Sequence, residues 1–154
     1  MQKPIKKIMV AVDFSDYTEP SVAYGITLAK QLRASLLLVN VVNSRDIMAV
    51  EKYLALQEPE IYRKFVDDTY ATRNDGLQKL LDQAATQGVE GRKLVKTGMP
   101  YQELLSTIES EQPDLLIMGT KGRGNLADAI IGSCAQKMYR RSPIPLLSIR
   151  PPRS

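Results

Sequence analysis

Three short runs of consecutive apolar residues constrain the fold of this chain more than any other feature. They lie within residues 5–12, 35–42 and 114–118. Each run has the length of a strand, and nearly every side chain in it is apolar, so both faces of the strand must be covered. Strands of this kind belong to parallel sheets with helices on both faces. The sequence therefore predicts a buried parallel β-sheet.

The segments between these runs have helical apolar spacing. Helices are predicted over about 18–33 and 59–87, from Pro100 to just before Pro113, and from Gly132-Ser133 to Arg140-Arg141. In the long helix one buried stripe is expected, made of Ile61, Phe65, Leu77, Leu80, Leu81 and Ala84. Two further strands are predicted at 92–96, whose polar flanks indicate a sheet edge, and at 143–149. Residues 44–58 have irregular apolar spacing and are interpreted as a surface excursion.

Strands and helices thus alternate strictly along the chain. This order favours a doubly wound α/β fold with right-handed crossovers and helices on both faces of the sheet. No internal repeat, linker or low-complexity segment divides the sequence. Residues 1–154 are therefore expected to form a single domain.

Two loops are candidates for a binding site, because ligands of such sheets lie beyond the carboxyl ends of the strands. The first loop is Asp13-Phe14-Ser15-Asp16, which follows the first strand. The second is the glycine-rich segment 119–124 after the fourth strand, which leads to Gly132-Ser133 at the start of a helix.

The composition of the second loop favours a phosphate ligand. Glycines let backbone amides approach an anion closely, and a helix N-terminus supplies unpaired N–H donors and a favourable dipole. Lys121 and Arg123 add positive charge. Each glycine alone is more often a turn former, and Ser133 alone is more often a helix cap. Their combination indicates phosphate binding.

Two familiar nucleotide motifs are absent from this loop. The Gly-x₄-Gly-Lys-Ser/Thr order of a P-loop is missing, so P-loop hydrolysis is not implied. Gly119, Gly122 and Gly124 also lack the Gly-x-Gly-x-x-Gly order and follow strand four instead of strand one. A dinucleotide-dependent dehydrogenase is therefore disfavoured.

The chain contains no histidine. Nucleophile pairs of the Ser-His and Cys-His types and histidine-ligated metal sites are thereby excluded. Any catalysis has to use carboxylates, Lys, Tyr or a metal ion bound through a ligand. We assign no catalytic residue and no protein metal site.

Charge and cysteine content bear on partners and compartment. The 21 Lys and Arg residues are scattered among 17 acids, which gives a net charge of +4 without a long basic run. We therefore expect no nucleic-acid partner. No apolar run approaches the ~18–20 residues that span a bilayer, so no membrane association is expected. The lone cysteine, Cys134, fits a reducing compartment and predicts a cytoplasmic protein.

The pattern Gly119-x-x-Gly122-x₉-Gly132-Ser133 resembles the ATP-binding signature of the universal stress protein family. The resemblance extends to the Ile8–Ser15 strand and turn, to Leu38–Val42, and to the landmarks at 98–100, 114–119 and 143–147. It covers nearly the whole chain, and residues 44–75 are the least characteristic.

The resemblance implies a Rossmann-like fold of the adenine nucleotide alpha hydrolase-like type, with five parallel strands in the order 3-2-1-4-5. It implies that Asp13 and Val41 lie near the adenine and ribose of ATP, on a wall made by Ala11, Val12, Phe14 and Ser15. It also implies that Gly119, Gly122, Gly132 and Ser133 hold the phosphates, with Met118 and Cys134 beside them and the charge of Arg123 nearby. A core role for Val41 and a helix-capping role for Asp13 are the alternatives.

Two positions depart from common usage in the family. Asn40 stands where histidine is frequent, and Cys134 stands where an aliphatic residue is usual. Asn40 is expected to be tolerated at a strand end. A cysteine near a helix N-terminus can have a lowered thiol pKa and be redox-reactive, but we favour a small packing residue.

The family further implies a homodimer that pairs through the last strand. The prolines at 143 and 145 would confine this pairing to the later half of that strand.

Three functions remain open from the sequence. The leading hypothesis is an ATP-binding stress or signalling module, with ADP and AMP as alternative ligands and Mg²⁺ bound through the phosphates. The second is a slow Mg²⁺-dependent ATP hydrolase, with at most weak activity. The third is a protein-interaction module that binds no nucleotide.

Overall fold

A parallel five-stranded sheet forms the centre of the protein in the computed structural model, which describes residues 3–121 and 131–150. The strands are β1 (Lys7–Ala11), β2 (Ser35–Asn43), β3 (Gly91–Gly98), β4 (Leu115–Gly119) and β5 (Leu146–Ile149). They lie in the order β3-β2-β1-β4-β5, and every neighbouring pair is parallel. The predicted fold class and strand order are confirmed, and β3 lies at a sheet edge as expected.

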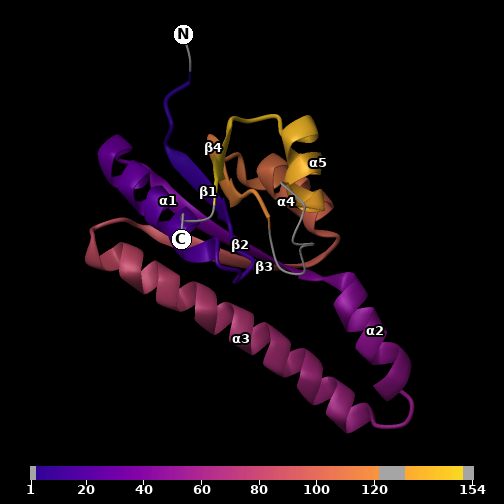
Figure 1. Ribbon diagram of the computed structural model, residues 1–154. Helices are drawn as coiled ribbons and strands as arrows, with labels where there is room; N and C mark the ends of the chain where they lie inside the picture. Colours follow the sequence, from indigo (N-terminus) through magenta and orange to yellow (C-terminus); the bar gives the residue numbers. More distant parts are fainter. Residues whose placement is uncertain (1–2, 122–130, 151–154) are drawn as a thin grey trace.

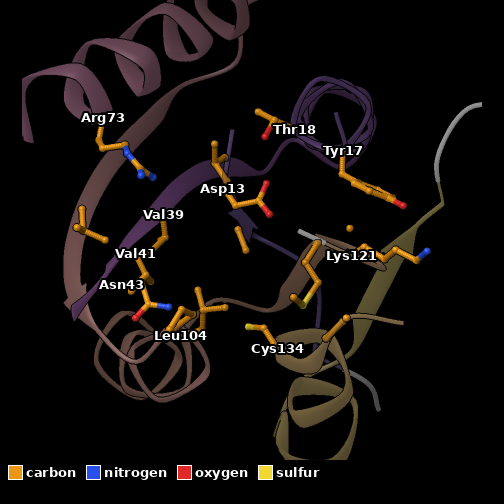
Figure 2. A pocket seen from close by; sticks show the side chains of 18 of the residues that line it. Asp13, Tyr17, Thr18, Val39, Val41, Asn43, Arg73, Leu104, Lys121 and Cys134 are labelled. Atoms are coloured by element: carbon orange, nitrogen blue, oxygen red, sulfur yellow. The ribbon is translucent and has the colours of Figure 1, made fainter. Parts of the chain in front are cut away.

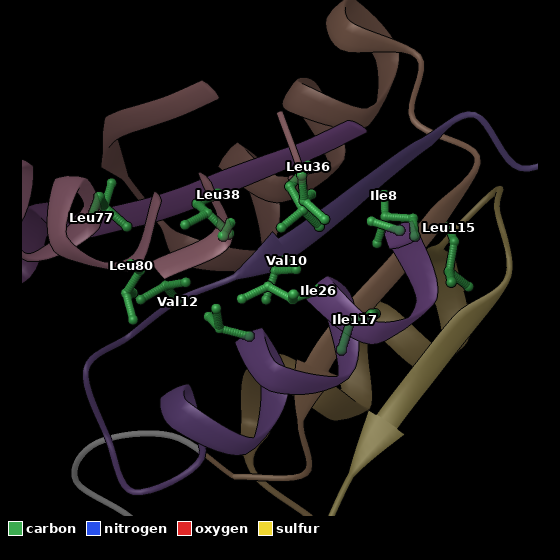
Figure 3. Packing of buried hydrophobic residues seen from close by; sticks show 14 of the residues in the cluster. Ile8, Val10, Val12, Ile26, Leu36, Leu38, Leu77, Leu80, Leu115 and Ile117 are labelled. Atoms are coloured by element: carbon green, nitrogen blue, oxygen red, sulfur yellow. The ribbon is translucent and has the colours of Figure 1, made fainter. Parts of the chain in front are cut away.

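Helices cover both faces of the sheet (Figure 1). On one face, α1 (Thr18–Leu32) and the later part of α3 (Pro59–Thr86) pack against Ile8 and Val10 of β1. Figure 3 shows this cluster. On the other face, α4 (Pro100–Glu111) and α5 (Ser133–Arg141) pack against Met9 of the same strand. The strands are apolar at consecutive positions because successive side chains enter two different cores.

Residues interpreted as a surface excursion contain a helix, α2 (Ser44–Leu54). Asn43 caps it, because its side-chain oxygen accepts the backbone N–H of Arg45 at 3.0 Å. No residue of α2 is buried. The surface location is as expected, but no helix was predicted here, although the half-buried residues Ile47, Val50 and Leu54 have helical spacing.

The stripe predicted on α3 holds only in its later part. Leu77, Leu80 and Ala84 are buried, whereas Ile61 is 54% exposed. Figure 1 shows the reason: the first part of α3 runs alongside α2 beyond the sheet, where no strand lies beneath it. No helix within residues 3–121 and 131–150 is long and apolar enough to cross a membrane.

The buried carboxylate of Asp114 fastens the start of β4 to the start of β1. Its side chain is only 7% exposed and accepts the backbone N–H groups of Lys6 and Lys7 at 2.8 and 2.9 Å. The ammonium group of Lys3 lies 2.9 Å from the other carboxylate oxygen. Burial raises the pKa of Asp114, but the two backbone donors and the Lys3 charge outweigh it, so the pKa is lowered.

Replacing this carboxylate by an amide should therefore destabilise the fold. We expect Asp114→Asn to lose about 1–2 kcal/mol in the free energy of unfolding at pH 7, as measured by urea denaturation. A depressed pKa stabilises the fold above the ordinary Asp range near 4, and this contribution is lost as the pH falls through the lowered pKa. The difference between the two proteins should thus vanish in acid. Asp68→Asn, at an exposed position of α3, is the control and should leave stability unchanged.

Candidate functional site

A cavity of about 560 Å³ opens at the carboxyl edge of the sheet. It is lined by the ends of β1, β2 and β4, the first turns of α1 and α5, and side chains from α2, α3 and α4. The chain leaves β1 and β4 in the middle of the sheet, where the strand order reverses, and ligands of doubly wound folds bind at this point. The volume is within the range of small-molecule sites.

Most of the site residues predicted from the sequence line this cavity. They are Ala11, Val12, Asp13, Val41, Met118, Gly119, Gly132, Ser133 and Cys134. The structure thus brings together residues from both candidate loops, as expected. Gly122 and Arg123 lie outside the described residues.

Phe14 and Ser15 are not among the lining residues. The Phe14 ring packs into the core formed with α1 and α3, and its backbone has a φ of 60°. The Ser15 hydroxyl oxygen accepts the backbone N–H of Tyr17 at 3.2 Å, just before α1. In the described structure these two residues shape the turn that presents Asp13.

Asp13 projects into the middle of the cavity, between Arg73 on one side and Lys121 on the other (Figure 2). One oxygen of its carboxylate accepts the backbone N–H of Ser15 at 3.0 Å, which closes a tight turn. The carboxylate therefore fixes its own turn and still faces the cavity, where its second oxygen is available to a ligand hydroxyl.

The amide of Asn40 is buried directly behind this turn. Only 1% of the residue is exposed. Its Nδ2 donates to the carbonyl oxygen of Val12 at 2.7 Å, and its Oδ1 accepts from the guanidinium of Arg73 at 3.4 Å. The sequence indicated only that asparagine is tolerated here. In the structure it connects β2, the end of β1 and α3.

Gly119 is required by packing at the rim of the cavity. A Cβ atom at this position would lie 2.6 Å from the Cβ of Tyr17, a distance that unstrained side chains do not reach. Any larger residue would therefore force the end of β4 away from the start of α1. The close approach of the Tyr17 side chain explains this glycine without reference to a ligand.

The N-terminus of α5 provides an anion-binding geometry at the opposite wall. Gly132 precedes the helix in an extended conformation (φ −71°, ψ 161°), and as a glycine it has no side chain to cap the first turn. The N–H of Gly132 is engaged by the carbonyl of Thr120 at 2.7 Å. The following N–H groups of the first turn have no intrahelical acceptor and carry the positive end of the helix dipole.

Several lining residues were not identified as site residues from the sequence. They are Tyr17, Thr18, Ser21, Val39, Val42, Asn43, Asp46, Ile47, Phe65, Thr69, Arg73, Pro100, Leu104, Lys121 and Ala135. Lys121 was recognised as a nearby charge, but the residues of α2 and α3 have no local motif. Only the packing of α3 against the sheet brings its residues to the cavity. The hydroxyl oxygens of Thr18 and Ser21 are buried and have no hydrogen-bond partner in the part of the chain that the structure describes.

Cys134 has the opposite electrostatics to a reactive thiol. Burial first, and then the negative charge of Asp13, raise the pKa of its thiol to about 11, although Lys137 opposes this effect. The alternative of a lowered pKa at the helix N-terminus is therefore wrong. The favoured interpretation as a packing residue agrees with its contact with the core beneath α4 and α5.

The sequence profile of the Universal stress protein family matches residues 4–150. A universal stress protein of Thermus aquaticus is 30% identical over 147 residues, which cover 94% of this chain and 98% of the relative. The universal stress protein YxiE of Bacillus subtilis is 26% identical over 148 residues, with 94% and 98% covered.

Solved structures of similar proteins share the fold. The structure of MJ0577 from Methanocaldococcus jannaschii has a TM-score of 0.84 at 22% identity and covers 99% of this chain and 100% of its own. A universal stress protein in complex with cAMP gives 0.66 at 19% identity, with 97% and 100% covered. One from Archaeoglobus fulgidus in complex with dAMP gives 0.67 at 15% identity, with 96% and 99% covered.

The raised pKa of Cys134 predicts a slow thiol. At pH 8 we expect iodoacetamide to alkylate Cys134 in the native protein on the order of 100-fold more slowly than in urea, because the thiolate is the reacting species. Mass spectrometry of timed samples measures both rates. Equal rates in the native and unfolded protein would contradict the buried, neutral thiol.

Proposed function

Because the chain belongs to the universal stress protein family, we propose that it is an ATP-binding member that acts as a nucleotide-responsive stress or signalling module. ADP and AMP are the alternative ligands. The observation that carries this proposal is the cavity at the carboxyl edge of the sheet, which brings the turn at Asp13 and the N-terminus of α5 to one site.

The two walls of the cavity suit the two ends of a nucleotide. At one wall, the first turn of α5, which begins at Ser133, offers backbone N–H groups to phosphate oxygens, and Gly132 leaves the approach to it free of a side chain. Lys121 contributes positive charge on the same side as β4. At the other wall, apolar side chains of β2, among them Val39 and Val41, suit a base, and the carboxylate of Asp13 can accept a ribose hydroxyl.

Known complexes of similar proteins support a nucleotide ligand. Proteins with the same fold have been crystallised with cAMP and with dAMP. Both ligands contain adenine, ribose or deoxyribose, and a phosphate. We propose that this chain holds an adenine nucleotide in the corresponding cavity, and that Mg²⁺ enters bound to the phosphates of ATP.

We propose binding without committed turnover. The chain has no histidine to serve as a general base. In the described part of the cavity the carboxylates are Asp13 and Asp46, and Asp13 is already engaged in its own turn. A slow ATP hydrolase remains the second candidate, because a carboxylate does face the cavity.

We further propose that two copies pair through β5. This strand forms one edge of the sheet, and its first three residues are only half-buried. An open edge of this kind offers unpaired backbone groups to a second chain.

Nucleotide binding should depend on free access to the start of α5. In native mass spectrometry and calorimetry we expect one adenine nucleotide per chain in the parent protein and its loss in Gly132→Val. The φ and ψ of Gly132 are extended and accessible to valine, and the added side chain should block the approach of the phosphates to the first turn of α5.

A control and a second test variant accompany this variant. Gln136→Val places the same side chain at an exposed position of α5 outside the cavity and should bind normally. Ser133→Ala, also at an exposed position, should weaken binding even if Gly132→Val proves unstable. A parent protein that stays empty at millimolar ATP with Mg²⁺ would refute the proposal.

Turnover separates the two candidates. With saturating ATP and Mg²⁺, we expect steady-state phosphate release below roughly one per minute, far under the ~1 s⁻¹ at the low end of ordinary enzymes. A coupled phosphate assay measures it. Sustained release above roughly one per minute, lost in Asp13→Asn at ATP concentrations that saturate the variant, would favour the slow hydrolase.

A further inference from the structure

The turn after β1 contains an aromatic residue in an unfavourable backbone conformation. Phe14 has a φ of 60°, in the left-handed region that favours glycine or asparagine. Such a conformation persists only where the surrounding structure holds it in place. The contacts of the Phe14 ring should therefore hold this turn in its conformation.

The ring is held against α3 at Gly76. A Cβ atom on Gly76 would lie 2.6 Å from Cε1 and 2.8 Å from Cζ of Phe14, so no other residue admits the ring in its present place. Glycine is unfavourable inside a helix. Its presence in the interior of α3 is explained by the space that the ring needs.

Arg73 holds the other side of the same turn. It lies three residues before Gly76 on one face of α3, and its guanidinium lies 5.9 Å from the centre of the Phe14 ring. The guanidinium also donates to Asn40, whose Nδ2 binds the carbonyl oxygen of Val12. The residues before and after Asp13 are thus both connected to α3.

We propose that Gly76 is a positioning residue for the nucleotide site: by admitting the Phe14 ring, it holds the Asp13 carboxylate in place for the ligand. This inference rests on the proposed nucleotide binding. Asp13 stands between two anchored neighbours and lines the cavity. If the ring is displaced, its packing no longer offsets the unfavourable φ of Phe14. The turn closed by the Asp13–Ser15 hydrogen bond then relaxes.

The test is Gly76→Ala. The atoms that the new methyl group meets are at the far end of the Phe14 side chain, so the ring can move while the protein stays folded. Alanine also favours the helix. We expect the melting temperature to hold and the Kd for MgATP to rise about tenfold, the size expected for weakening one hydrogen bond to a charged group. Asn74→Ala, at an exposed position of the same helix, is the matched control and should keep the parent Kd.

A double-mutant cycle separates positioning from a general structural role. If Gly76 acts through the Asp13 carboxylate, Gly76→Ala should have no further effect on the Kd in an Asp13→Asn background. An equal loss of affinity in both backgrounds would overturn the inference.

A ligand-free measurement distinguishes failure of this inference from failure of the proposed function. The Asp13 charge disfavours the Cys134 thiolate. Displacing Asp13 should therefore speed the alkylation of Cys134 by iodoacetamide at pH 8.5, in Gly76→Ala as in Asp13→Asn and not in Asn74→Ala. If the parent binds no nucleotide, the proposed function fails and this rate still tests the positioning. Parent-like alkylation in Gly76→Ala, with a faster rate in Asp13→Asn, would overturn it.

Discussion

Burial of the sheet on both faces is the constraint on which the rest of this structure depends. Side chains of β1, β2 and β4 point alternately into two cores, so helices must pack on both sides. Because all the strands are parallel, every strand-to-helix turn lies at the same edge of the sheet. The strand order reverses between β1 and β4, and the cavity opens at this point of the carboxyl edge. The site therefore follows from the covering of the sheet.

The turn after β1 shows how packing contacts hold a residue of the cavity wall in place. Its backbone is strained at Phe14, yet it is held by contacts from a helix about 60 residues later in the sequence. The same helix, α3, continues beyond the sheet beside α2, whose residues are all at least partly exposed (Figure 1). One helix thus both lines the cavity and packs against the exposed helix α2.

The sequence predicted what depends on local pattern and missed what depends on tertiary contact. Continuous apolar runs identified β1, β2 and β4, and the alternation of elements identified the fold. By contrast, α2 was not predicted: Ile47, Val50 and Leu54 have helical spacing, but none of its residues is fully buried and the apolar stripe is short. Arg73, Thr69 and Phe65 reach the cavity only through the path of α3. The raised thiol pKa of Cys134 arises from burial and from Asp13, which no local motif encodes.

The glycines of the signature do not all carry the same evidence for a ligand. Gly119 is needed wherever β4 meets Tyr17 this closely, so its presence would be expected in a protein with this packing and an empty cavity. Gly132 is different, because its φ and ψ are extended and accessible to any residue. Its backbone conformation therefore does not account for the glycine. The first turn of α5, where Gly132 has no side chain to cap the N–H groups, therefore supports a proposed phosphate ligand more strongly than the number of glycines does.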